Sequence, residues 1–237
     1  MITEKYYSEI TKVLETVQKS QKDNILKAAE AIAETIKNDG IIYMFGCGHS
    51  HLIALDCFYR AGGLANVCPV LDADLMLHDG AAKSSVLEKT SGISEHVIRR
   101  YCLTEKDTFV VISTSGGNAA PIEAAKCAKK TGATTISITS MAYLGKKSEH
   151  LSEITDIVLD NHAPYGDAVI DIPGGVKMGS TSTVSSSYLA NAMILKAVEI
   201  CSNQGISVPA YKSGNIEGGA EYNKSIIDKY LPKIKHL

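Results

Sequence analysis

The sequence has little net charge, because its 237 residues include 24 Lys and Arg against 26 Asp and Glu, a formal balance of −2. It therefore lacks the basic surface that is typical of nucleic-acid-binding proteins. No apolar stretch is long enough to span a membrane, and the amphipathic N-terminal segment lacks the apolar centre of a signal peptide. We expect no nucleic-acid partner, no membrane partner and a cytoplasmic location.

The six cysteines include no C-x-x-C pair. Several lie in apolar stretches, such as Cys127 and Cys201, and we expect them to be small buried apolar residues in a reducing compartment. The G-x-x-x-x-G-K-[ST] motif of nucleotide-binding loops is also absent, and His51 interrupts a possible G-x-G-x-x-G. These absences disfavour a dinucleotide site, and we predict no cofactor.

What the sequence does contain is a regular alternation of short β-branched segments with helical ones. Strands are predicted at 41–45, 67–71, 108–112, 134–139 and 154–159, with helices at 50–62, 91–102 and 118–131 between them. Two helices, at 2–19 and 21–38, precede the first strand, and a strand-like stretch at 168–172, a helix at 183–202 and a last short helix follow. Nearly continuous apolar strands are typical of a parallel sheet buried on both faces. We predict a single α/β domain over 1–237 with a doubly wound sheet.

Glycine and hydroxyl side chains gather where two strands end. The first strand is followed by Gly46, Gly48 and Ser50, and the third by Ser113, Thr114, Ser115, Gly117 and Asn118. Ser180, Thr181 and Ser182 form a third such segment, at the predicted start of the long helix. Glycine lets the backbone approach a ligand, and helix N-termini attract anions. Because these segments contain no Lys or Arg, they suit the phosphate of a small polyol, although each alone could be a turn or a helix cap.

The three segments resemble those of the sugar isomerase (SIS) domain family. The match rests on S-T-S-G at 113–116, G-x-G-x-S at 46–50 and the hydroxyl-rich segment from 179, and it covers about 35–205. Uncharacterised phosphoheptose isomerase-like SIS proteins also share the S-G-N-I-E-G-G-A-E-Y-N tail. The resemblance implies a five-stranded, flavodoxin-like three-layer sandwich, phosphate ligands at Ser50 and 113–115, and a homodimer or homotetramer with sites near the subunit interfaces. Gly117 and Asn118 depart from the family's S-T-S-G-N-S.

The resemblance favours aldose–ketose isomerisation of a sugar phosphate, which requires a base to move a proton between adjacent carbons. Glu88 is our candidate base, because its region is similar to one that carries a catalytic glutamate in related etherases. The alternative is a solvated glutamate paired with Lys89. His49 is our candidate for ring opening or proton transfer, ahead of His51 and His78.

Cys47, His49 and His51 form a C-x-H-x-H pattern, but no acidic residue lies nearby in sequence, and we predict no metal site. Asp160, Asp167 and Asp171 either bond sugar hydroxyls, order their loop or are solvated. By resemblance alone, Ser213 and Asn215 in the tail would reach the site of a neighbouring subunit.

Two other functions stay open at this point. The same proton abstraction would serve an etherase or a deglycase, in which a linked group is expelled. A non-catalytic sugar-phosphate sensor is the other alternative. SIS-domain transcription regulators carry an added helix-turn-helix domain, for which the forty residues before the first strand leave too little room beside the predicted helices.

Overall fold

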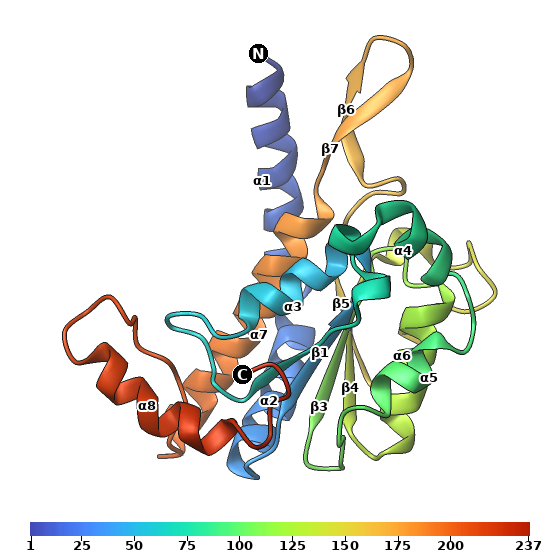
Figure 1. Ribbon diagram of the computed structural model, residues 1–237. Coiled ribbons are helices and arrows are strands. Elements are labelled where there is room, and N and C mark those ends of the chain that lie inside the picture. The colour runs from blue at the N-terminus through green and yellow to red at the C-terminus, as the bar shows by residue number, and fades with distance from the viewer.

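A five-stranded parallel sheet forms the centre of the computed structural model, which describes residues 1–237. The strands are β1 (Ile42–Gly46), β2 (Val67–Val70), β3 (Thr108–Ile112), β4 (Thr134–Thr139) and β5 (Ile157–Asp160). They lie in the order β2-β1-β3-β4-β5, and every neighbouring pair is parallel. Helices cover both faces of the sheet (Figure 1). The predicted flavodoxin-like three-layer sandwich is confirmed.

Each face of the sheet packs against its own hydrophobic core. On one face, Ile42 and Met44 pack with α2 (Lys22–Lys37), α3 (His51–Cys57) and α7 (Ser182–Asn203). On the other, Tyr43 and Phe45 pack with α5 (Ile93–Ile98), α6 (Ala119–Lys130) and the C-terminal segment around α8 (Gly219–Tyr230). Successive residues of a strand point to opposite faces, so a strand covered on both sides must be apolar throughout. This explains why the central strands show no polar alternation.

Two N-terminal helices precede the first strand, as predicted, but only part of the first one packs on the body. In α1 (Ile2–Ser20) Val17 is the one buried residue. The first half of α1 projects from the body beside an antiparallel hairpin of β6 (Ala168–Ile172) and β7 (Val176–Ser180) (Figure 1). The Tyr6 hydroxyl donates to the Ser180 carbonyl at 2.7 Å and ties the two elements together.

Several predicted boundaries were wrong, and tertiary contacts explain the clearest case. The helix predicted at 50–62 ends at Cys57 because residues 62–65 bond to the tail: Gly62 N donates to the Tyr211 carbonyl, and Ala65 N to that of Pro209. The helix predicted at 91–102 shortens to α5, and the fifth strand begins at Ile157. Strand β7 and helix α4 (Ala81–Leu87) were not predicted.

None of the helices combines the length and the apolar character that crossing a bilayer requires.

Candidate functional site

A small cleft lies at the carboxyl edge of the sheet, where the loops after β1 and β3 meet the start of α7. Its walls are made by His49, Ser50, Ile53, Ile112, Thr114, Ser182, Thr183 and Ser186. One hydroxyl from each predicted segment is present: Ser50, Thr114 and Ser182. The enclosed volume is about 20 Å³, which is room for about one water molecule, so a larger ligand requires the side chains at the mouth to move apart.

The sheet topology brings the first two loops together. Strands β1 and β3 are neighbours with parallel pairing, and the strand order reverses direction between them, which is where open α/β sheets bind ligands. After β1 the chain turns so tightly that a Cβ on Gly46 would lie 2.6 Å from the Ser50 carbonyl carbon. Glycine at 46 is therefore required for the turn that places Ser50 at the cleft.

The loop after β3 is shaped by its own hydrogen bonds. Ser113 is buried, and its Oγ accepts from the Gly116 amide at 3.3 Å. Gly116 has a φ of 60°, a left-handed conformation that favours glycine. Ser115, Gly117 and Asn118 are half-buried at the end of the loop, outside the cleft wall, and α6 begins directly after Asn118.

Glu88 lies beside this loop, not in the wall of the cleft. Its Oε1 accepts from the Asn118 side-chain amide at 2.9 Å, and its carbonyl accepts from the Ala120 amide at 2.9 Å. It also lies near the buried Cys47, whose thiol pKa is raised by burial and by the negative charges of Glu88 and Asp72. The predicted base thus bonds to Asn118 and not to Lys89, and sits between the first two predicted loops.

The three candidate histidines have different surroundings. His49 is exposed and forms part of the cleft wall. His51 is buried, its Nδ1 bonds the Gly48 carbonyl, and burial lowers its pKa. His78 is exposed, with its ring 6.1 Å from that of His51. No group of three His, Cys, Asp or Glu side chains is placed to hold a metal ion.

The third predicted segment needs a correction. Ser180 does not open the long helix: it lies in β7 and is exposed, and α7 begins only at Ser182. The carboxylate of Asp167 occupies the helix start, where it accepts from the Thr181 and Ser182 amides at 2.9 and 2.8 Å and from Ser182 Oγ at 2.6 Å. An internal carboxylate therefore already accepts from the Thr181 and Ser182 amides, so these two amides are not free to bind a phosphate.

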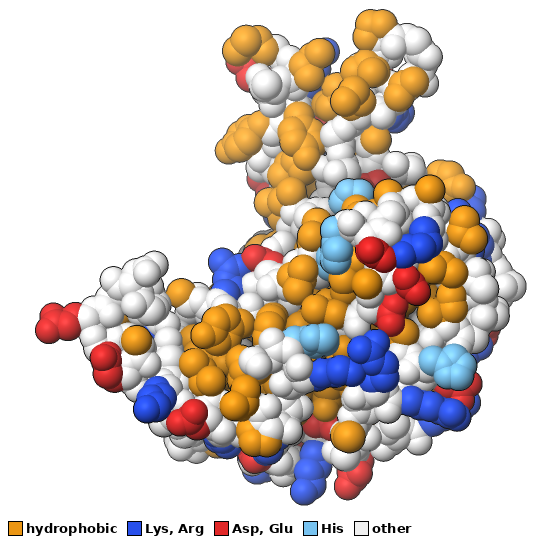
Figure 2. Space-filling model, viewed as in Figure 1, with side chains coloured by type: hydrophobic (Ala, Val, Ile, Leu, Met, Phe, Trp, Pro, Cys, Tyr) orange, Lys and Arg blue, Asp and Glu red, His pale blue; other side chains and the backbone are white.

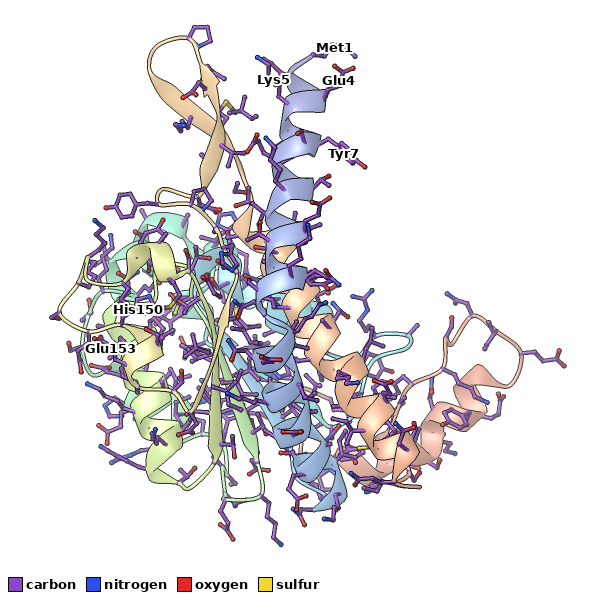
Figure 3. The ribbon with its side chains drawn as sticks, turned by 180° about the vertical axis from the view of Figure 1, so that it is seen from behind. Met1, Glu4, Lys5, Tyr7, His150 and Glu153 are labelled. Atoms are coloured by element: carbon purple, nitrogen blue, oxygen red, sulfur yellow. The ribbon has the colours of Figure 1, made fainter.

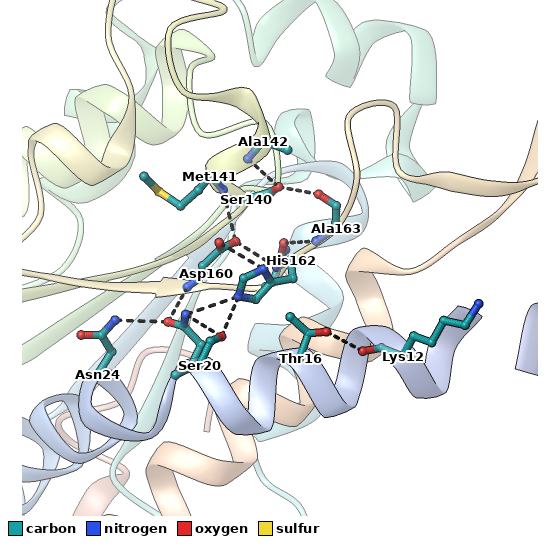
Figure 4. A network of polar contacts seen from close by, with 12 residues as sticks. Lys12, Thr16, Ser20, Asn24, Ser140, Met141, Ala142, Asp160, His162 and Ala163 are labelled. Atoms are coloured by element: carbon teal, nitrogen blue, oxygen red, sulfur yellow. Dashed lines mark hydrogen bonds and ion pairs between the residues drawn. The ribbon is translucent and has the colours of Figure 1, made fainter. Parts of the chain in front are cut away.

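The remaining acidic residues serve the loops around the cleft or stay at the surface. Asp160 Oδ1 accepts from the amides of Met141 and His162 at 3.2 and 2.9 Å (Figure 4). The His162 ring in turn bonds Ser20 Oγ at 2.7 Å, which ties the end of α1 to the end of β5. Asp171 is exposed, 3.4 Å from the Lys177 amine.

The tail residues Ser213 and Asn215 lie apart from the cleft of their own chain. Ser213 is half-buried and Asn215 exposed, in the loop before α8, where the Asn215 amide donates to Ser213 Oγ at 3.2 Å.

Three residues near the cleft were missed by the sequence analysis: Asn161, Ser186 and His150. Asn161 is fully buried directly after β5, and its amide bonds both Thr114 and Ser186. His150 is 2% exposed beneath the loop after β3 (Figure 3 shows it with Glu153), and burial lowers its pKa. The only sequence signal for Asn161 is its place after a predicted strand.

A much larger cavity lies at the opposite, amino edge of the sheet. It measures about 830 Å³ and is lined by residues 38–41, 43, 100–102, 104, 106–107, 231–235 and 237. It contains none of the predicted site residues, and ligands of open α/β sheets bind at the other edge. We therefore place the candidate site at the small cleft.

Comparison with known proteins agrees with this architecture. A SIS domain model matches residues 5–140. A UPF0309 protein of Geobacillus kaustophilus is 42% identical over 98% of this chain and 95% of its own length. Among solved structures, the phosphoheptose isomerase of Neisseria gonorrhoeae superposes with a TM-score of 0.60 at 20% identity, covering 83% of this chain and 97% of that one. A phosphoheptose isomerase of Francisella tularensis has a TM-score of 0.55 at 15% identity, covering 83% and 96%. The chain belongs to the SIS domain family.

Proposed function

We propose that the protein binds a phosphorylated sugar at the cleft and interconverts its aldose and ketose forms. The observation that carries the proposal is the meeting of Ser50, Thr114, Ser182 and Ser186 in one cleft at the carboxyl edge of the sheet. None of the residues in its walls is Lys or Arg, so hydroxyl groups are the main donors to an anion. Family membership and the phosphoheptose isomerases among the structural neighbours support the same substrate class.

The phosphate would be held by the loops after β1 and β3. Ser50 and Thr114 supply hydroxyls from the cleft wall. Ser115, Gly117 and Asn118 would contribute if the substrate displaces the side chains at the mouth, since they continue the same loop into α6. Ser113 acts indirectly, because its oxygen holds the Gly116 amide.

The isomerisation moves a proton from the hydroxyl-bearing carbon next to the carbonyl to the carbonyl carbon itself, while the proton of that hydroxyl group moves to the carbonyl oxygen. Glu88 would remove this proton, and its hydrogen bond to Asn118 fixes the carboxylate next to the phosphate loop. His49, exposed at the cleft wall, would deliver a proton to the ring oxygen when the cyclic sugar opens. Glu88 lies outside the cleft wall, so it reaches the substrate only if the sugar extends from the cleft towards Asn118.

The test is a panel of pentose, hexose, heptose and amino-sugar phosphates followed by proton NMR. We expect one of them to be converted into its isomer with exchange of one carbon-bound proton for solvent deuterium. Glu88→Gln keeps an oxygen that can accept from Asn118 and should lower kcat at least 100-fold, the usual range for a lost general base. Glu30→Gln, at an exposed site on α2, should leave kcat unchanged.

Three outcomes would contradict parts of this proposal. Loss of a substituent together with deuterium uptake would indicate an etherase or a deglycase. Binding without turnover of any sugar phosphate would indicate a sensor. Unchanged kcat in Glu88→Gln would show that Glu88 is not the base, but it would not contradict the isomerase activity.

We also propose that the protein acts as a homodimer or homotetramer. The projecting end of α1 and the β6–β7 hairpin expose apolar side chains next to each other (Figure 2). Ile2 and Tyr7 on α1 and Val176 and Met178 on β7 are more than half exposed. Adjacent exposed apolar residues on projecting elements are typical of protein interfaces.

A further inference from the structure

Asn161 has a side-chain orientation that its neighbours determine. It follows β5, is fully buried, and its Oδ1 accepts from the Ala163 amide at 3.0 Å. A backbone N–H can only donate, so the atom facing it must be the oxygen. The amide nitrogen of Asn161 therefore points the other way, towards the cleft.

The nitrogen of Asn161 donates to two hydroxyl groups. Its Nδ2 lies 3.0 Å from Ser186 Oγ and 3.3 Å from Thr114 Oγ1. A side-chain amide carries two N–H hydrogens and Nδ2 has no lone pair that accepts, so Asn161 is the donor in both bonds. Both hydroxyl oxygens are thus acceptors towards Asn161.

In this arrangement the hydroxyl hydrogens of Thr114 and Ser186 have no acceptor within the protein. A hydroxyl has one hydrogen, and neither Thr114 nor Ser186 donates it to a protein acceptor, while both side chains line the cleft. Ser182 differs, because its Oγ lies 2.6 Å from Asp167 Oδ2, which as a carboxylate oxygen can only accept. The Ser182 hydroxyl hydrogen is therefore already donated to Asp167.

We propose that Asn161 orients the Thr114 and Ser186 hydroxyls so that both donate into the cleft, and that Ser186 is a ligand of the substrate phosphate. The inference rests on the proposed sugar-phosphate site and extends it. Asn161 acts as a positioning residue that makes the cleft rich in donors without any Lys or Arg in its walls. A tetrahedral oxyanion accepts such hydrogen bonds, and a neutral sugar hydroxyl gains less from them because bonds to charged groups are stronger.

Two adjacent serines of α7 provide a matched pair for the test. Ser185 and Ser186 are both buried, but Ser185 Oγ bonds the carbonyls of Thr181 and Ser182 within the helix, at 3.2 and 3.4 Å. Binding of inorganic phosphate to the full chain would be measured by isothermal titration calorimetry. We expect Ser186→Ala to weaken binding about 10-fold or more, the loss typical of one hydrogen bond to a charged group, and Ser185→Ala to change it less than twofold.

Asn161→Asp tests the orientation itself. A carboxylate at this position can still accept from Ala163, but it would also accept the hydrogens of Thr114 and Ser186 and add a negative charge. We expect phosphate binding to fall at least 100-fold while the thermal unfolding transition stays cooperative.

The possible failures are distinguishable. If the wild-type chain binds neither inorganic phosphate nor any sugar phosphate, the proposed site itself is wrong. If the wild type binds phosphate but Ser186→Ala binds as tightly as Ser185→Ala, or a folded Asn161→Asp binds within twofold of the wild type, the inference about Asn161 and Ser186 is overturned. If Asn161→Asp does not fold, the comparison of Ser186→Ala with Ser185→Ala alone tests the inference.

Discussion

His150 packs directly beneath the loop after β3, against Gly116. Its Nδ1 accepts from the Ser152 amide at 3.3 Å, so the neutral ring carries its proton on Nε2, which lies 3.4 Å from Thr139 Oγ1. A Cβ added to Gly116 would collide with both His150 Nε2 and Thr139 Oγ1. The Gly116 carbonyl also accepts from the Leu151 amide at 2.8 Å. The loop can therefore pack this closely on residues 150–151 only because residue 116 is glycine.

We predict that Gly116→Ala destabilises the protein by about 2–4 kcal/mol. About 1–2 kcal/mol comes from placing alanine at a φ of 60°, and the rest from overlap with His150 and Thr139. The free energy of unfolding would be measured by urea denaturation at a fixed protein concentration.

Gly145 supplies the control for this prediction. It has a similar positive φ of 75°, but a Cβ there would meet nothing within 4 Å. Gly145→Ala should therefore show the backbone cost alone. Equal losses of stability in the two variants would mean that His150 and Thr139 move aside freely, and that the loop is not fixed from below.

At the scale of elements, the start of α7 is stabilised by a residue fourteen positions earlier in the chain. Asp167 accepts from the amides of Thr181 and Ser182 and from both of their hydroxyls, while Thr181, the N-cap, makes no capping bond with its own side chain. A negative charge at a helix N-terminus is favoured by the helix dipole. Asp167 thereby joins the loop before the hairpin to the helix that borders the cleft.

We predict that Asp167→Gly lowers the free energy of unfolding by about 1–2 kcal/mol, because hydrogen bonds to a charged carboxylate are lost. Asp167→Asn should cost less than half as much, because an amide oxygen can still accept from the two backbone amides. Asn tolerates the positive φ of 62° at this position about as well as Asp does, whereas Gly relieves it, so the loss measured for Asp167→Gly is a lower limit for the lost bonds. Urea denaturation of the two variants is the measurement, and indistinguishable losses would show that the carboxylate does not cap α7.

The same elements show what the sequence could and could not predict. Strands β1 and β3 were predictable because burial on both faces requires unbroken apolar runs. Strand β7 was not, because its residues are largely exposed and carry no burial pattern at all. The loops after β1 and β3 were found through glycines and hydroxyls at strand ends, whereas Asn161 and Asp167 act through contacts with residues 14–47 positions away, which no local pattern reveals.

At the scale of the whole molecule, the body and its projection have different surfaces. The body buries two hydrophobic cores around the sheet, but the first half of α1 and the hairpin form a projection whose apolar residues face solvent (Figures 2 and 3). A two-stranded hairpin is only marginally stable in water unless something covers it. Because α1 leaves Val176 and Met178 of the hairpin more than half exposed, a second copy of the chain is the cover that we propose.

This proposal predicts that substitutions on the projection dissociate the protein. Tyr7 is 74% exposed and Met178 58% exposed, so Tyr7→Lys combined with Met178→Lys places two charges on the surface without opening either core. In sedimentation velocity, we expect the wild-type chain to run as a dimer or tetramer and the double variant to run as a monomer, because burying two unpaired charges opposes association. Val86→Lys, at an apolar residue on α4 that is 64% exposed, should leave the assembly intact. A monomeric wild type would refute the oligomer, and an assembled double variant would place the interface on another surface, leaving the exposed apolar residues of α1 and β7 without a function in assembly.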